Sequence, residues 1–280
     1  MREIQVSKIT ECVQELSLEA GIRLGEDIVH RLEKAQETEA SPQGREVLRK
    51  LAENARIAQS ESLPICQDTG FAVVFMEIGQ DVHFTGGDLR EAVNEGIRRG
   101  YRKGYFRNSI VGDPLDRKNT DDNTPCVLYT DIVAGDRVKI CFAPKGGGSE
   151  NTSTIRMLPP SSGIQGVKAF VLEQVQSVGA NACPPVIVGV GIGGTFEQCA
   201  LLAKKALFRT AGSRHPNALY ARLEQELLEA INRLGIGPAG FGGSTTALGV
   251  FIEVYPCHIA SLPVAVNMQC HAARHKETII

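Results

Sequence analysis

The spacing of the apolar residues changes along the chain, and this change constrains the possible folds more than any other feature. Over the first sixty residues apolar side chains recur every three or four positions, as Ile9, Val13 and Leu16 do, which predicts helices. Short apolar or alternating runs predict strands at 71–75, 138–143, 185–190, 247–255 and 262–268, and helical spacing returns at 89–101, 164–178, 195–208 and 219–234. We therefore expect an α/β fold of the mixed α+β kind, with a helical N-terminal region followed by a strand–helix region.

The length of the chain bounds its domain organisation. At 280 residues the chain is about 1.9 times a typical domain length, so it can form one large domain or two lobes. No linker separates two halves, and no internal repeat is present. We expect one domain over residues 1–280, either undivided or with two lobes that divide near residue 145.

The composition excludes several classes of function. The formal net charge is −2 and tryptophan is absent, so the chain has neither a general basic field nor many stacking platforms for nucleic acid. No apolar run approaches the roughly 20 residues that span a bilayer, and the N-terminus does not resemble a signal peptide. The eight cysteines are too sparse for a disulfide scaffold. We expect a cytoplasmic protein whose cysteines are thiols or metal ligands.

Residues 189–194, Gly-Val-Gly-Ile-Gly-Gly, satisfy the glycine pattern of a dinucleotide-binding turn between a strand and a helix. That function needs a second strand ending in an acidic residue about 20 positions later, to bind the ribose hydroxyls. The corresponding segment, 209–216, has neither a strand pattern nor an acid. A tight turn with close strand–helix packing is therefore the better interpretation, and a nucleotide-binding oxidoreductase is the weaker one.

The cysteines fall into three groups. Cys12, Cys141 and Cys199 lie on apolar faces and suit a protein core, whereas Cys126 and Cys257 adjoin prolines and cannot be assigned. Another three lie beside proline, glycine or polar residues at the edges of predicted elements, where a thiol would be exposed: Cys66, Cys183 and Cys270. Their separations match no zinc finger or ferredoxin, so spacing alone does not establish a metal site.

Several long motifs, in order along the chain, carry a resemblance to a known family. They are Pro-Ile-Cys-Gln-Asp-Thr-Gly at 64–70, Lys-Gly-Gly-Gly-Ser-Glu-Asn at 145–151, Ala-Cys-Pro-Pro at 182–185 with the glycines of 189–194, and the segment 262–270. Together they resemble the α subunit of class I, iron–sulfur fumarate hydratase, whose wider family includes L-tartrate dehydratase. The resemblance covers nearly the whole chain from about residue 10.

The resemblance implies a cofactor and a reaction. The cofactor is a 4Fe-4S cluster with three cysteine ligands, which in this sequence are Cys66, Cys183 and Cys270. Because three ligands leave one iron uncapped, that iron would act as a Lewis acid towards a substrate carboxylate and the hydroxyl that is added or lost. The implied reaction is the reversible hydration of fumarate to L-malate, a step of the tricarboxylic acid cycle.

The resemblance also implies the other site residues. Asp68 corresponds to an active-site carboxylate that would move a proton, although an Asx turn is the alternative, and Gln67 would bind substrate beside it. Arg107 would bind a substrate carboxylate through its planar guanidinium group. Backbone N–H groups of Gly146, Gly147 and Gly148 would approach the dianion, with a simple turn as the alternative. His258 corresponds to an active-site histidine, with a buried structural histidine as the alternative.

The resemblance further implies a partner, and it leaves the substrate open. A β-type domain supplies the rest of the active site in single-chain relatives, so we expect a separate β subunit and an α2β2 assembly. An L-tartrate dehydratase α subunit, or a hydratase of mesaconate or another small dicarboxylate, remains an alternative, although Ser-Glu-Asn at 149–151 resembles the fumarase branch better. A non-catalytic iron–sulfur scaffold or sensor is a different class of function. The retention of Gln67, Asp68 and Arg107 argues against it, since a scaffold needs only the ligands.

Overall fold

The computed structural model describes residues 1–280, which divide into two compact units. The first unit contains residues 1–25, 55–147 and 274–280, and the second contains residues 26–54 and 148–273. The division crosses the helix α3 (Pro42–Glu61) and follows the first residue of the short helix α5 (Gly147–Glu150). Both units mix helices and strands, which confirms the expected fold class.

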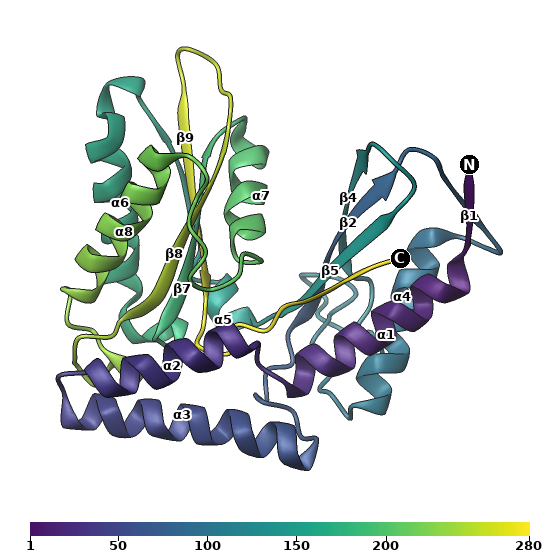
Figure 1. Cartoon of the computed structure of the whole chain (residues 1–280), viewed down its shortest axis with the longest axis horizontal. Helices are drawn as coiled ribbons and strands as arrows, with labels where there is room; N and C mark the ends of the chain where they lie inside the picture. The colour runs from purple at the N-terminus through teal and green to yellow at the C-terminus, as the bar shows by residue number, and fades with distance from the viewer. The chain divides into compact units, whose positions relative to one another are not determined.

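The first unit is built on a four-stranded sheet with the order β10-β5-β2-β4 (Figure 1). In it, β2 pairs parallel with β4 and antiparallel with β5, and β10 pairs antiparallel with β5. A second, small sheet pairs β1 with β3. The elements of this unit are β1 (Arg2–Gln5), α1 (Val6–Ile22), β2 (Phe71–Gly79), β3 (Val82–Thr85), α4 (Leu89–Lys103), β4 (Val127–Val133), β5 (Val138–Lys145) and β10 (Lys276–Ile279).

The core of the first unit lies between its large sheet and the paired helices α1 and α4. As the alternating pattern predicts, Val138, Ile140 and Phe142 of β5 are fully buried. The two helices pack closely because α4 carries glycine at the contact: a Cβ at Gly100 would lie 1.8 Å from the hydroxyl oxygen of Ser17. Asp88 caps α4 by accepting a hydrogen bond from the Glu91 N–H.

The second unit has a central sheet with helices on both faces. Its sheet has the order β6-β9-β7-β8, in which β7 is parallel to β8 and antiparallel to β9. Figure 1 shows α7 on one face of this sheet and α6 with α8 on the other. The elements are α2 (Glu26–Thr38), β6 (Thr154–Leu158), η1 (Pro160–Ser162), α6 (Gly163–Val178), η2 (Gly179–Ala182), β7 (Val186–Gly193), α7 (Phe196–Ala206), α8 (Ala218–Asn232), η3 (Pro238–Gly240), β8 (Ala247–Tyr255) and β9 (Leu262–Gln269).

The glycines of 189–194 serve the packing of α7 on β7. A Cβ at Gly189 would lie 2.2 Å from the carbonyl oxygen of Ala203, and one at Gly191 would lie 2.0 Å from that of Cys199. Residues 207–217 form no strand after α7, so the second strand of a dinucleotide-binding unit is missing. The prediction of a tight turn with close strand–helix packing is confirmed.

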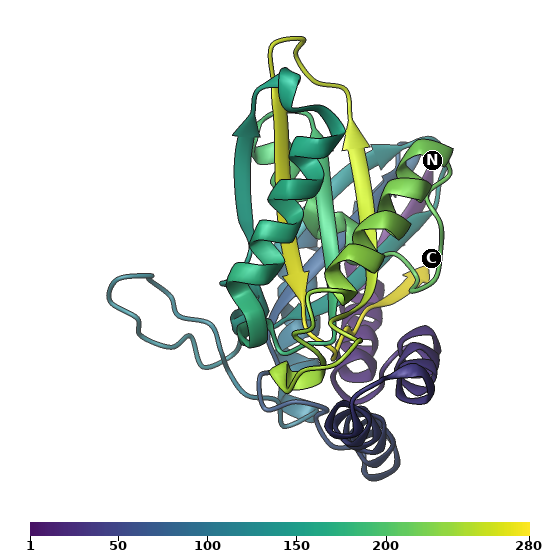
Figure 2. The ribbon, with the colours of Figure 1, turned by 90° about the vertical axis from the view of Figure 1, so that its left-hand side faces the viewer.

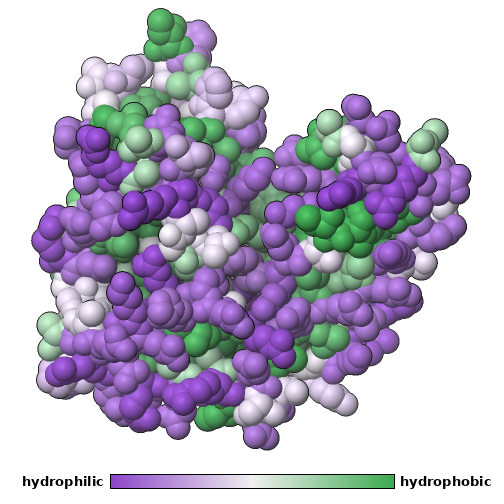
Figure 3. Space-filling view, in the orientation of Figure 1, coloured by the Kyte–Doolittle hydropathy of each residue, from purple (hydrophilic) through white to green (hydrophobic).

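Two loops extend from these layers. Figure 2 shows the long connection between α4 and β4 reaching away from its sheet, and one isolated bridge joins Val111 to Asn119 within it. In the second unit, the connection between β8 and β9 lies at the top of the view in Figure 3. Its surface there is partly hydrophobic, with hydrophilic groups around it. Ile259 of this connection is 92% exposed.

Candidate active site

In the first unit, the segment 66–70 forms a loop between α3 and β2 that several hydrogen bonds hold in place. The N–H of Ile65 donates to the carbonyl of Gly21 at 3.0 Å, immediately before the loop. The Tyr101 hydroxyl donates to the carbonyl of Thr69 at 2.9 Å, and the side-chain amide of Asn123 donates to that of Gly70 at 3.2 Å. Burial raises the pKa of Tyr101, so its hydroxyl remains a donor.

Asp68 of this loop is half-buried, and both of its carboxylate oxygens accept backbone hydrogen bonds. Oδ1 accepts from the Gly70 N–H at 3.0 Å, which is the Asx turn that the sequence offered as an alternative. Oδ2 accepts from the Gly147 N–H at 2.9 Å. The carboxylate therefore joins two of the recognised motifs within the first unit, and the N–H of Gly147 is already engaged by the protein.

Glycine is required where these two motifs meet. Gly70 has φ +69°, and a Cβ there would lie 2.7 Å from the backbone of Lys145. A Cβ at Gly146 would lie 3.0 Å from Asp68 Oδ2. Larger residues at either position would separate the Asp68 loop from the 145–147 segment.

Arg274 is a residue of this site that the sequence did not point to. It is 2% exposed, and its Nη2 donates to the carbonyl oxygen of Asp68 at 3.0 Å. Its Nε and Nη1 atoms are buried and have no acceptor in the structure. Burying a cation whose donors have no acceptors costs folding free energy, and a native structure that keeps such a group calls for an explanation such as a functional role. The one available signal was an arginine four residues after Cys270 in an otherwise apolar Ala-Ala-Arg sequence.

The other expected site residues of the first unit are less buried than Arg274. Cys66 is half-buried, and Gln67 is exposed. Arg107 is also exposed, and its backbone carbonyl accepts a hydrogen bond from the Thr69 hydroxyl at 2.7 Å. The backbone of Arg107 is thereby tied to the Asp68 loop, while its guanidinium group is open to solvent.

In the second unit, Cys183 and Cys270 lie on adjoining segments. Cys183 precedes β7 and Cys270 follows β9, and the antiparallel register pairs Ile187 with Gln269 at this end of the sheet. The carbonyl of Cys183 accepts a hydrogen bond from the N–H of His271 at 3.4 Å. Cys183 is exposed and has a left-handed backbone with φ 55°, and Cys270 is half-buried. Two cysteines 87 positions apart in the sequence thus flank the same end of two neighbouring strands.

The segment that begins at Gly148 is fastened inside the second unit through Glu150. The Glu150 carboxylate accepts from Lys204 Nζ of α7 at 2.6 Å and from the side-chain amide of Asn267 of β9 at 3.0 Å. Asn267 also donates to the hydroxyl of Ser153 at 2.9 Å. Glu150 therefore links this segment to α7 and β9 within the second unit.

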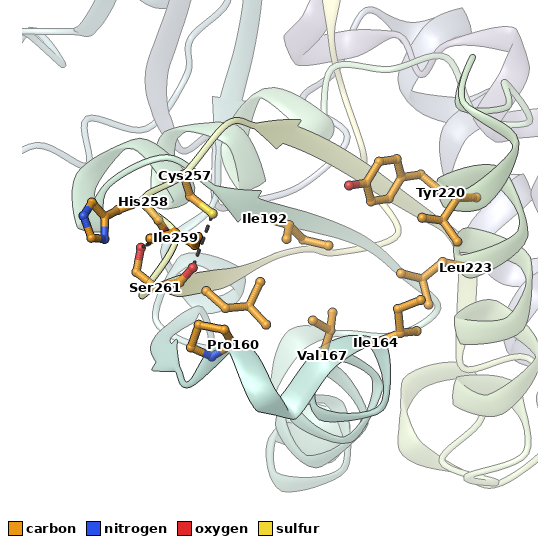
Figure 4. A pocket seen from close by; sticks show the side chains of 13 residues that line it. Pro160, Ile164, Val167, Ile192, Tyr220, Leu223, Cys257, His258, Ile259 and Ser261 are labelled. Carbon is orange, nitrogen blue, oxygen red and sulfur yellow. Dashed lines mark hydrogen bonds between the residues drawn. The ribbon is translucent and has the colours of Figure 1, made fainter.

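His258 lies at the opposite end of the sheet from Cys270. It belongs to the β8–β9 connection, and the eight residues of β9 span about 27 Å between the two positions. His258 is exposed, so it is not the buried structural histidine that was the alternative; its Nδ1 accepts from the N–H of Ala260 at 3.1 Å. Figure 4 shows its ring turned away from an apolar hollow of about 370 Å³ that Ile164 and Tyr220 help to line.

Comparison with known proteins identifies the family. The model of the family described as fumarate hydratase (Fumerase) matches residues 10–279. The chain belongs to the fumarate hydratase family of hydro-lyases. A Methanocaldococcus jannaschii protein, provisionally named L(+)-tartrate dehydratase subunit alpha, is 44% identical over 95% of each chain. The L(+)-tartrate dehydratase subunit alpha of Escherichia coli strain K12 is 35% identical over 98% of this chain and 91% of that protein.

Four of the other five cysteines of this fumarate hydratase family member are poorly suited to bind iron. Burial raises the pKa of the Cys126 and Cys199 thiols to about 11 and that of Cys141 to about 12. Burial also raises the pKa of Cys12. Since thiolate is the form that binds metal, these four are disfavoured as ligands. The predictions of core positions for Cys12, Cys141 and Cys199 agree with their partial or full burial.

The three remaining motif cysteines have the donor chemistry that an iron–sulfur cluster requires. Cys183 is exposed, Cys66 and Cys270 are half-buried, and none is bridged in a disulfide. Within single units, the structure contains no group of three or more His, Cys, Asp or Glu side chains arranged to hold a metal ion. The donor set is accordingly divided, with Cys66 in the first unit and the other two in the second.

Every helix is too short or too polar to span a membrane.

Proposed function

We propose that this chain is the α subunit of an iron–sulfur hydro-lyase that adds water to, or removes it from, a four-carbon dicarboxylate. The observation that carries the proposal is the antiparallel pairing of β7 with β9, which puts the segments of Cys183 and Cys270 side by side. A non-catalytic scaffold would not need the constrained carboxylate of Asp68 or the buried cation of Arg274 beside it.

In this proposal, Cys66, Cys183 and Cys270 hold a 4Fe-4S cluster. Such a cluster supplies a Lewis-acidic iron that binds oxygen ligands and stabilises a departing hydroxide. Cysteine thiolates are the ligands that these clusters prefer, and the half-buried to exposed positions of the three thiols allow them to be loaded.

Asp68 is the group that we propose to move the proton. Two backbone N–H donors fix its carboxylate in one orientation, and lone pairs on both oxygens remain for a substrate hydroxyl. Arg274 Nη2 donates to the backbone carbonyl of the same residue, and this bond helps to hold the loop in place. Gln67 and Arg107 are exposed at this loop and are proposed to contact the substrate. His258 stays outside the proposed site because about 27 Å of strand separates it from Cys270.

The glycines are proposed to act mainly through the shape of the backbone. Gly146 and Gly147 allow the main chain to approach the Asp68 carboxylate, and the N–H of Gly147 is used there. Gly148 begins the segment that Glu150 fastens to β9. A substrate dianion would therefore meet a backbone already fixed by internal bonds.

We propose fumarate and L-malate as the substrate pair, on the description of the matching family. L(+)-tartrate is the second candidate, and the names of the M. jannaschii and E. coli relatives favour it. The same names include "subunit alpha", which supports a partner subunit for this chain; that it is of the β type, in an α2β2 complex, is part of the proposal.

The test is to express the chain with a β-type partner, load it anaerobically with iron and sulfide, and supply both substrates. Loss of the ultraviolet absorbance of fumarate measures hydration, and oxaloacetate formation measures dehydration of tartrate. Asp68→Asn should lower turnover about 10²- to 10⁴-fold, the usual contribution of a general acid–base group. A loaded complex that turns over neither substrate would contradict the proposal, and turnover by the α chain alone would contradict the need for a partner.

A further inference from the structure

The second unit contains another hollow, away from the cysteine segments, with an unusual concentration of arginine. It has a volume of about 420 Å³ and lies along β8, between α2, the segment 212–214 and α8. Arg31, Arg214 and Arg222 line it. These residues come from three separate parts of the sequence, so the fold, and not one charged run, assembles the cluster.

The three guanidinium groups have no carboxylate to neutralise them. None of Arg31, Arg214 and Arg222 takes part in an ion pair in the structure. Two acids also line the hollow, but both are committed to other cations. Glu224 binds Arg209 at 2.6 Å, and Glu226 binds Lys168. The hollow therefore carries an uncompensated positive charge, which favours an anionic occupant.

The buried Glu224 accepts three hydrogen bonds, none of them from an arginine of the cluster. Its Oε1 accepts from the N–H of Ile252 at 2.8 Å in addition to Arg209, and its Oε2 accepts from the N–H of His215 at 3.1 Å. The nearest acid on α2, Asp27, accepts from the N–H of Ala211 at 2.7 Å. These bonds also fix the 211–215 segment against α2 and α8.

The wall formed by β8 adds a backbone donor. The N–H and the carbonyl of Ile252 both point away from the sheet, to Glu224 and Arg209. Because orientation alternates along a strand, Val250 presents its own N–H and carbonyl to the same edge, and Val250 lines the hollow. The apolar residues Leu248 and Phe251 of β8 and Leu228 of α8 also line the hollow.

Gly212 leaves room for the guanidinium group of Arg31 at the hollow. Gly212 has φ +101°, and a Cβ there would lie 2.8 Å from Nη2 of Arg31. The guanidinium group of Arg31, which is half-buried, lies against this glycine. This close approach places the guanidinium group of Arg31 at the wall of the hollow.

We propose that this hollow binds a small phosphate ester, at a site separate from the proposed catalytic residues. Guanidinium groups suit phosphate because they offer paired donors in a plane, and three of them match a group with two negative charges. The volume exceeds that of a phosphate group alone, and the apolar side of the hollow suits an attached ring or chain.

The test is calorimetric titration of the full chain, at constant ionic strength, with AMP as the probe and adenosine as the probe that lacks phosphate. AMP should bind and adenosine should bind at least tenfold more weakly. Arg31→Ala, Arg214→Ala and Arg222→Ala should each weaken AMP binding at least threefold, and the triple variant at least thirtyfold. Arg233→Ala, an exposed arginine at the end of α8 that does not line the hollow, is the matched control and should leave binding unchanged.

Several results would overturn the proposal. They are equal binding of adenosine and AMP, AMP binding that the three variants leave unchanged, and no heat of binding with AMP or with inorganic pyrophosphate at millimolar concentration. Fumarate that binds this chain more tightly than AMP and is lost in the same variants would replace phosphate by a dicarboxylate, and so would contradict it. Thermal melts of each variant show whether the fold is retained. Cys183→Ser should bind AMP normally, so failure of the proposed catalytic function would leave this result unaffected.

Discussion

Arg274 is a buried arginine with more hydrogen-bond donors than the structure satisfies. One nitrogen fixes the Asp68 carbonyl, and two buried nitrogens lack acceptors. We expect Arg274→Lys to lower kcat/KM at least tenfold, or about 1.4 kcal/mol in transition-state stabilisation, because lysine keeps the charge but loses the fixed planar geometry. Steady-state kinetics and a thermal melt of the loaded complex measure the two effects. Unchanged kinetics would remove Arg274 from the site, and Arg233→Lys is the control.

The thiols should differ in reactivity with pH. With a pKa of about 11, Cys126 and Cys199 have about one thiolate per thousand molecules at pH 8, and Cys141, with a pKa of about 12, has fewer. In the metal-free chain, we expect iodoacetamide to label the exposed Cys183 and Cys257 first, and mass spectrometry assigns the sites. Early labelling of Cys141 would contradict the effect of burial.

The raised pKa values of these buried thiols also make the stability of the folded chain fall at high pH. Since the folded chain holds these thiol protons more tightly than the unfolded chain, whose thiols have a pKa near 9.0, the stabilisation is complete below about pH 9. It decreases as the pH rises from there towards about 12. Urea unfolding at pH 8 and pH 10.5 measures the loss. Serine at Cys141 should reduce the pH dependence.

At the residue scale, the motifs predicted local turns better than contacts between distant segments. The Asp-Thr-Gly sequence predicted the Asx turn of Asp68, because an aspartate two positions before a glycine forms such a turn in many contexts. The sequence did not predict that Gly147 binds its second oxygen, since that contact joins positions 79 residues apart. Arg274 was missed because burial of a single arginine leaves no periodic signal.

At the element scale, Glu150 connects three segments of the second unit. Glu150→Ala leaves the buried ammonium group of Lys204 without its partner, and we expect a loss of about 2 kcal/mol in the free energy of unfolding. Restoring a neutral interior with Glu150→Ala plus Lys204→Met should recover part of it. Urea denaturation measures both. Glu173→Ala, which removes an exposed pair with Arg156, is the control and should change stability little. Equal effects in the two pairs would contradict the role of Glu150.

The contact of α7 with β7 depends on glycine. Gly191→Ala would place a methyl group 2.0 Å from the carbonyl of Cys199, so the helix must move outward. Overpacking of this kind costs about 1–3 kcal/mol, and we expect a lower Tm. Gly112→Ala is the control, because its nearest neighbour lies at 3.8 Å and its φ is not positive. A Tm for Gly191→Ala equal to that of the control would contradict close packing.

Periodicity predicted the long elements well and the short ones poorly. The strands of the second unit core, β7, β8 and β9, fall where apolar runs predict them, because β7 is buried throughout and the other two are buried over most of their lengths. The strands β1, β3, β4, β6 and β10 were missed, since nearly all of their side chains are half-buried or exposed and their hydrogen bonds come from partners far away in the sequence. The helix α8 ends at Asn232, two residues before its predicted end.

At the scale of the whole molecule, the chain joins a sheet-and-helix unit to a second unit of similar construction. The sequence predicted the mixed fold class and the family, because several long motifs recur in a fixed order. It did not predict that residues 26–54 belong with the second unit and 274–280 with the first, since no local pattern records which distant segments a helix or strand will join. The cysteines of the proposed cluster belong to both units, with Cys66 in the first and Cys183 and Cys270 in the second.

Iron binding by cysteine variants is therefore the most direct test of the account. After anaerobic reconstitution, we expect the full chain to hold about four iron and four sulfide per chain, and Cys66→Ser, Cys183→Ser and Cys270→Ser each to lose most of both. Cys12→Ser, which removes a half-buried thiol outside the proposed site, should keep the full complement. Retention of the full cluster by any of the three variants, or its loss in Cys12→Ser with the fold intact, would contradict the proposed ligands.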